Sequence, residues 1–187
     1  MPCVCWSCCL PVGSQTLCMT NTYLFLLVPV IGAGILHMVI VKWSVGQFLA
    51  IPVSTTLLGA NKTWRGVVVM PVLSAIFAVV LRGLLAEMPA WEAGAIGLLT
   101  GLAYVVFEWP NSWLKRRLGV AAGQQTKRLQ GLFMVLDKTD SAFGVSLTGA
   151  WLFGLSFSEW WPLFLIAAVL HAVLSILLVG LGIKKTF

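Results

Sequence analysis

The sequence predicts an all-α integral membrane protein, a polytopic bundle of five transmembrane helices. Hydrophobic residues occupy 59% of its 187 positions, charged residues occupy 10%, and the mean hydropathy is +0.97. This composition lies outside the range of soluble globular proteins and within the range of polytopic membrane proteins. Two further observations predict this fold class: a set of long apolar runs, and an uneven distribution of the basic residues among the loops.

Residues 1–20 precede the first apolar run and hold all five cysteines of the chain, Cys3, Cys5, Cys8, Cys9 and Cys18. No later pair of Cys or His residues offers the spacing that a zinc site requires. We therefore interpret residues 1–20 as a leader without defined structure or function, with Met19 as an alternative start of translation. Disulfide formation after export is the other use for these cysteines. Residues 21–187 are then a single transmembrane domain.

Five apolar runs cover about residues 22–41, 66–84, 93–107, 140–156 and 161–182. A helix needs roughly 20 apolar residues to cross a bilayer, so the third run is the shortest candidate. Within it, Gly97 and Gly101 have the G-x-x-x-G spacing that allows close helix packing. The small residues of the fourth run favour a central position. The fifth run is nearly all aliphatic apart from His171, whose neutral imidazole we expect to bond a neighbouring helix. The run itself is predicted to face lipid.

The basic residues gather in alternate loops. The first loop contains Lys42, Lys62 and Arg65, the third contains a basic cluster, and the chain ends with Lys184 and Lys185. The second and fourth loops contain the acidic residues Glu87, Glu92 and Glu159, with Arg82 nearby. Lys and Arg accumulate in cytoplasmic loops. The pattern therefore predicts an N-terminus outside and a C-terminus in the cytoplasm.

This pattern places the protein in the inner (cytoplasmic) cell membrane, with its functional face on the cytoplasmic side. The net charge of +6 describes a basic face that attracts the anionic headgroups of membrane lipids. Nucleic acid is not an expected partner, because no soluble domain is present to carry a groove-reading element. The oligomeric state stays open, and a homodimer is one option.

The segment from Glu108 to Ser141 concentrates charge between apolar runs. Its six cations are Lys115, Arg116, Arg117, Lys127, Arg128 and Lys138. Asp137 and Asp140 lie three residues apart among them. Cations bind phosphate oxygens, and paired carboxylates hold a divalent ion. The segment therefore suits a phosphate-rich, metal-bound ligand.

A second basic motif, Asn61-Lys62-Thr63-Trp64-Arg65-Gly66, leads into the second apolar run. Lys62 and Arg65 are three residues apart, which on a helix puts both on one face at the cytoplasmic boundary. There they are candidates for phosphate binding. The alternative is that interfacial Lys and Arg side chains snorkel toward the headgroups, as they do in many membrane helices.

Pro110 is predicted to end the third helix, because its ring interrupts the ladder of backbone hydrogen bonds. Asn111 and Ser112 would then cap a short helix that carries the three cations at 115–117, and its N-terminus would favour anions. The polar segment 119–131 is short enough to act as a flap over a bound nucleotide. A solvated linker is the alternative interpretation of that segment.

Asp137 and Asp140 meet the predicted start of the fourth helix, next to Ser141. Carboxylates at a membrane boundary are costly unless they are paired or bound to a metal ion. We therefore predict that both hold Mg²⁺. An ion pair with Lys138 or Arg65 is the structural alternative.

Three motifs occur together in this chain: Asn61-Lys62-Thr63-Trp64-Arg65-Gly66, Pro110-Asn111-Ser112-x-x-Lys115-Arg116-Arg117-x-Gly119 and Asp137-x-x-Asp140-Ser141. In combination they resemble the CDP-archaeol synthase family, a small branch of the CDP-diglyceride synthase (phosphatidate cytidylyltransferase) superfamily. The resemblance covers the chain from Tyr23 to the C-terminus and includes the five-helix layout.

The resemblance implies a catalytic domain that transfers CMP from CTP to a lipid phosphomonoester and releases pyrophosphate. The lipid is either phosphatidic acid or an archaetidic-type ether lipid phosphate. Mg²⁺ on Asp137 and Asp140 would bridge the triphosphate, with Lys115 and Arg116 on its oxygens. Lys62 and Arg65 would bind the lipid phosphate. The other expected substrate-binding residues are Asn61, Asn111, Ser112, Arg117 and Ser141.

A small membrane transporter or ion-coupled carrier is the alternative from another class, with Glu108 and Asp140 as its coupling sites. Transport needs charged groups near the middle of the bilayer, whereas these cluster at one boundary. A scaffold without chemistry would leave the coincidence of three charged motifs unexplained.

Overall fold

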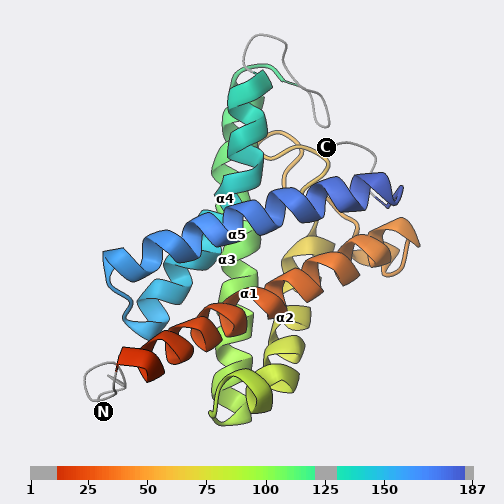
Figure 1. The fold of residues 1–187 in the computed structure, drawn as a ribbon. Helices are drawn as coiled ribbons and strands as arrows, with labels where there is room; N and C mark the ends of the chain where they lie inside the picture. The colour runs from red at the N-terminus through yellow and green to blue at the C-terminus, as the bar shows by residue number, and fades with distance from the viewer. Residues whose placement is uncertain (1–11, 121–129, 184–187) are drawn as a thin grey trace.

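The computed structural model describes residues 12–120 and 130–183 and is all-helical. Five α-helices and one short 3-10 helix follow each other along the chain (Figure 1). They are α1 (Val12–Lys42), η2 (Gln47–Leu49), α2 (Trp64–Leu85), α3 (Ala90–Arg117), α4 (Gln130–Phe153) and α5 (Phe157–Gly180). The predicted all-α class and the five long helices are confirmed.

Four of these helices are long and apolar enough to cross a membrane: Met19–Lys42 within α1, α2, α3 and α5. The prediction of a membrane protein rests on these four. Helix α4 is not among them, because Asp137, Lys138 and Asp140 interrupt it and leave a shorter apolar stretch at residues 141–153.

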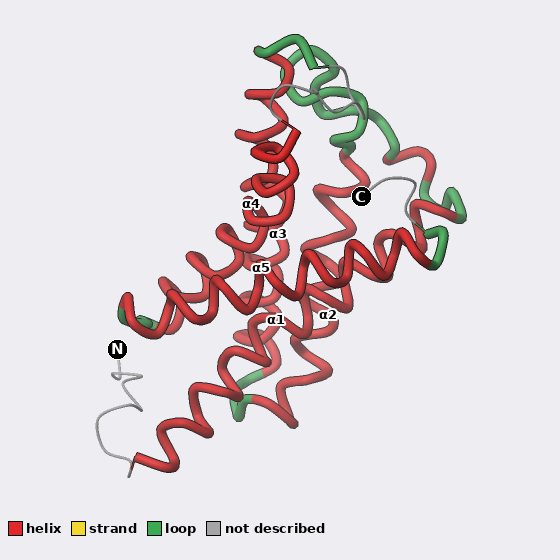
Figure 2. The backbone as a smooth tube through the Cα atoms, turned by 45° about the horizontal axis from the view of Figure 1, so that its top comes forward, coloured by secondary structure: helices red, strands yellow, loops and turns green. Residues whose placement is uncertain are grey.

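The helices start and end in two groups (Figures 1 and 2). The start of α1, the α2–α3 connection and the α4–α5 connection lie toward one end of the molecule. The segment 43–63 and the end of α5 lie toward the other. Helices α1 and α5 run in the same direction and cross α3 obliquely. The segment 43–63, which contains Lys62, and the last turns of α3, which contain Lys115 and Arg116, line one cavity.

Glycines set the spacing between α2, α3 and α4. A Cβ atom on Gly97 would lie 2.5 Å from the backbone oxygen of Ser74 in α2, and one on Gly101 would lie 2.7 Å from the Cα of Pro71. The G-x-x-x-G packing prediction is thus confirmed, with α2 as the partner. A Cβ atom on Gly144 of α4 would lie 2.5 Å from the ring of Phe107 in α3. Close approach on both faces of α3 places it between α2 and α4.

The predicted end of the third helix at Pro110 is wrong. Helix α3 continues through this proline to Arg117, ten residues beyond the predicted run. Membrane helices tolerate internal prolines because neighbouring helices and Ser or Thr side chains satisfy the backbone groups that are freed. Helices α1, α2 and α5 likewise contain Pro29, Pro71 and Pro162.

Two predictions concern segments that are described only in part. Of the proposed leader, residues 1–11 lie outside the described residues, and helix α1 already begins at Val12. Of the proposed flap at 119–131, residues 121–129 lie outside them. Both interpretations stay predictions.

Candidate functional site

A cavity of about 690 Å³ opens where the ends of α1, α3 and α5 meet the beginnings of α2 and α4. The segment 50–63 forms one of its walls. Its charged lining consists of Lys62, Arg65, Glu108, Lys115, Arg116, Asp137, Lys138 and Asp140. We call this space the polar cavity. It brings together residues from all three motifs, although these are far apart in the sequence.

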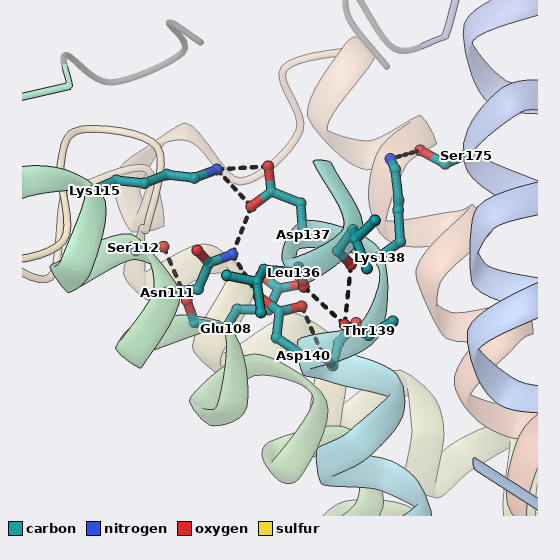
Figure 3. Close-up of polar contacts among 12 residues, drawn as sticks. Glu108, Asn111, Ser112, Lys115, Leu136, Asp137, Lys138, Thr139, Asp140 and Ser175 are labelled. Carbon is teal, nitrogen blue, oxygen red and sulfur yellow. Dashed lines mark hydrogen bonds and ion pairs between the residues drawn. The ribbon is translucent and has the colours of Figure 1, made fainter. Parts of the chain in front are cut away.

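Helical periodicity puts the candidate site side chains of α3 on one face. Tyr104, Glu108, Ser112 and Lys115 follow each other at intervals of three or four residues, and all four line the polar cavity. Asn111, next to Ser112, points from the same helix toward α4 (Figure 3). The close packing of α3 on α4 one turn earlier brings this face within reach of the α4 carboxylates.

Asn111 joins the two carboxylates of α4. Its side-chain nitrogen Nδ2 donates to Oδ1 of Asp137 at 2.6 Å and to Oδ2 of Asp140 at 3.1 Å (Figure 3). Asn111 is 8% exposed, and its side-chain oxygen Oδ1 has no hydrogen-bond partner among the described residues. The predicted capping role of Asn111 and Ser112 is wrong, because both residues lie inside α3. Asn111 instead holds the carboxylate pair together.

Lys115 is the ion-pair partner of Asp137. Its ammonium group lies 2.5 Å from both carboxylate oxygens and 5.4 Å from the ring centre of Phe133. Among the ion pairs of the described residues, Asp137 pairs with Lys115 and not with the structural alternatives Lys138 or Arg65. Lys138 donates to Ser175 of α5 at 2.6 Å, and Arg65 donates to the backbone oxygen of Val45 at 3.2 Å.

Lys62 precedes α2 and forms an ion pair with Glu108 of α3. Backbone hydrogen bonds between residues 51–53 and 62–64 fold the segment back on itself and aim Lys62 at the cavity. Burial acts to lower the pKa of Lys62, but the Glu108 carboxylate outweighs it, and the pKa lies above its ordinary value. The predicted shared helical face of Lys62 and Arg65 is wrong, since only Arg65 lies on α2. Both still line the cavity.

The guanidinium groups of Arg65 and Arg116 each have a buried N–H donor, at Nε, without a partner among the described residues. Both side chains line the polar cavity. A buried donor without a partner is unfavourable, and an anion in the cavity would satisfy it. The polar cavity therefore has two buried cationic donors that an anion could satisfy.

The remaining predicted site residues lie at different depths. Asn61 and Ser112 line the polar cavity, and Ser112 donates to the backbone oxygen of Glu108 at 2.9 Å. Arg117 is exposed and lies 5.2 Å from the ring of Trp113, outside the cavity lining. Ser141 is fully buried and points to His171 of α5.

A network around His171 was not recognised as part of the site from sequence. Its Nδ1 lies 3.0 Å from the hydroxyl of Ser141 and 3.1 Å from the backbone oxygen of Lys138, and its Nε2 lies 3.3 Å from the hydroxyl of Tyr104. The predicted bond to a neighbouring helix is confirmed. His171 also lines the polar cavity. The available signal was an imidazole in the middle of a strongly apolar helix.

The donor set fits a magnesium ion that shares its coordination with a ligand. Among residues 12–120 and 130–183, no three His, Cys, Asp or Glu side chains are grouped closely enough to hold a metal ion by themselves. Asp137 and Asp140 nevertheless share one amide donor and face the cations of α3. Mg²⁺ is commonly bound by one or two carboxylates together with phosphate oxygens and water.

Comparisons of the chain with protein-family models, with curated proteins and with solved structures found no match.

Proposed function

We propose that this protein is a Mg²⁺-dependent cytidylyltransferase, which transfers CMP from CTP to a lipid phosphomonoester and releases pyrophosphate. The activity is that of the CDP-archaeol synthase family, which the three motifs resemble. The observation that carries the proposal is the meeting of these motifs in one polar cavity. If these charged residues served only as interfacial anchors, there would be no reason for all three motifs to line the same cavity.

The cavity contents suit phosphoryl chemistry. In the reaction, an oxygen of the lipid phosphate forms a bond to the α-phosphorus of CTP. The bond to the β-phosphate bridging oxygen breaks, and pyrophosphate leaves with that electron pair. Such transfers depend mainly on positioning the reactants and on neutralising charge. Lys115 and Arg116 would contact the triphosphate oxygens, and Lys62 and Arg65 the lipid phosphate.

Asp137 and Asp140 would hold the magnesium ion together with phosphate oxygens. When bound, the ion would neutralise the triphosphate and favour the departure of pyrophosphate. Asn111 keeps the two carboxylates next to each other at 2.6 and 3.1 Å from its nitrogen. The ammonium group of Lys115 pairs with Asp137 and would turn to a phosphate oxygen of CTP.

The proposed setting is the cytoplasmic face of the inner cell membrane. Helix α4 would be the fourth of five spans, with its charged residues 137–140 at the cytoplasmic boundary and its apolar residues 141–153 in the bilayer. The N-terminus would lie outside, because this orientation puts the basic segments on the cytoplasmic side. The same arrangement disfavours the transporter alternative, since the cavity charges gather at one end of the helices.

Purified protein in detergent tests the proposal directly. The protein is given CTP, Mg²⁺ and either phosphatidic acid or an archaetidic-type ether lipid phosphate. Release of pyrophosphate together with a CDP-lipid detected by mass spectrometry supports the proposal. Absence of product with both lipids, from protein that elutes as one monodisperse species, contradicts it.

A further inference from the structure

A second, narrower cavity of about 110 Å³ lies between α1, α4 and α5. Its lining is mostly aliphatic and includes Leu27, Ile31, Ile35, Val145, Leu170 and Leu174. We call it the apolar groove. Along α1 the lining extends from Leu27 to Met38, which corresponds to roughly 16 Å of helix at 1.5 Å per residue. The groove is therefore long and thin.

The apolar groove adjoins the polar cavity. Met38, Tyr104 and His171 line both of them. Lys138 lines the polar cavity, but its side chain turns away from Asp137 and Asp140 and reaches Ser175, which lines the groove (Figure 3). A strongly polar space thus continues into an apolar one, with a buried cation at the boundary.

This combination selects an amphiphile as ligand. A nucleotide would fill only the polar side, and a free hydrocarbon would fill only the apolar side. The volume of the groove suits a segment of one chain and not a whole lipid. The outer faces of α1 and α5 beside it expose Leu36 and Leu177, so the rest of the chain would meet membrane lipid.

We propose that the apolar groove binds the headgroup-proximal segment of one hydrocarbon chain of the lipid phosphate, with Lys138 and Ser175 at its polar mouth. This inference rests on the proposed function for the identity of the headgroup. It adds a chain-binding site and makes Lys138 a contact for the phosphate or glycerol oxygens of the lipid. His171 and Tyr104 separate the chain from the nucleotide side.

Gly34 offers a position from which a side chain can enter the groove. It lines the groove, and a Cβ atom added there would meet no heavy atom within 4 Å. Gly34→Phe therefore places a ring in the space assigned to the chain. Gly83→Phe is the matched control, because Gly83 is equally open, lies on a helix and lines neither cavity.

The test is photolabelling with phosphatidic acid that carries a diazirine on an acyl carbon near the glycerol. Labelled peptides are mapped by mass spectrometry, with unlabelled phosphatidic acid or phosphatidylcholine as competitor. We expect labels within residues 27–38 and 167–178, lost with excess phosphatidic acid and retained with phosphatidylcholine. Gly34→Phe should reduce them about tenfold, roughly the loss of two buried methylene groups. Gly83→Phe should leave them unchanged.

Labels spread over the outer helix faces, or equal competition by both lipids, would overturn the groove assignment. Labelling does not require turnover, so it separates the two proposals. Groove labelling without cytidylyl transfer would support the chain site and contradict the enzyme. Transfer with labels elsewhere would contradict only the chain site. In an active enzyme, Gly34→Phe should raise the KM for the long-chain lipid phosphate and leave the KM for CTP unchanged.

Discussion

The ammonium group of Lys115 lies 2.5 Å from both carboxylate oxygens of Asp137. The two residues belong to α3 and α4 and are partly exposed to the cavity, with 15% and 40% of their side chains accessible. Solvent-exposed ion pairs contribute only about 0 to 1 kcal/mol, and this pair opens to the cavity on one side. Separating Lys115 from Asp137 therefore costs little free energy, and each side chain is available to a ligand group. The lysine would turn to a phosphate and the carboxylate to a metal ion.

Asp137→Asn and Asp140→Asn should each lower the rate of CDP-lipid formation by at least about 100-fold, because each removes a charge needed for the metal ion and the triphosphate. Rates are measured at saturating CTP and lipid phosphate. Glu92→Gln, at the other end of α3, is the control and should keep the wild-type rate. Unchanged circular dichroism would show that the fold is intact. Wild-type rates in either aspartate variant would remove the metal assignment.

Asn111→Leu should weaken the response to magnesium. The substitution keeps a similar volume but removes the amide that donates to both carboxylates. Loss of a group that orients metal ligands typically costs 10- to 100-fold in metal affinity. We expect the Mg²⁺ concentration for half-maximal rate to rise by about tenfold or more. An unaltered magnesium dependence would mean that Asn111 does not organise the site.

Gly97→Ala should destabilise the protein, because the new methyl group would lie 2.5 Å from a backbone oxygen of α2. Overpacking of this kind costs about 1 to 3 kcal/mol. Gly83→Ala meets nothing within 4 Å and should leave the stability equal or raise it by up to about 1 kcal/mol. Thermal unfolding in detergent compares the two variants. Equal midpoints would contradict the close packing of α2 on α3.

The proposed orientation predicts opposite labelling of two exposed positions. Glu87→Cys and Arg117→Cys are made separately in a chain whose five native cysteines are replaced by serine. An impermeant maleimide applied to intact cells should label Glu87→Cys. It should label Arg117→Cys only after the membrane is opened. Labelling of both positions from the same side would rule out α3 as a complete span.

Much of the fold could be predicted because it depends on local patterns. Apolar run length predicts the helices, and the three-residue spacing of Asp137 and Asp140 places both on one face of α4. The spacing of Gly97 and Gly101 predicts a packing face, although it does not name α2 as the partner. These features depend on residues that are close together in the sequence, so a single sequence is enough to predict them.

The pairings within the site could not be predicted, because they join residues that are distant in the sequence. Nothing near Lys115 indicates that Asp137 is its partner, and nothing near Lys62 indicates Glu108. The predicted helix end at Pro110 failed for a related reason. The rule that proline ends a helix holds for exposed backbone in water, whereas packing against neighbouring helices overrides it here.

The most direct test of cytidylyl transfer follows the phosphorus atoms of CTP. Purified protein is incubated with Mg²⁺, a lipid phosphate and CTP that is radiolabelled at either the α- or the γ-phosphate. If the protein transfers CMP, the α label appears in the lipid fraction and the γ label in pyrophosphate. A γ label in the lipid fraction, or no label there from either nucleotide, would contradict it.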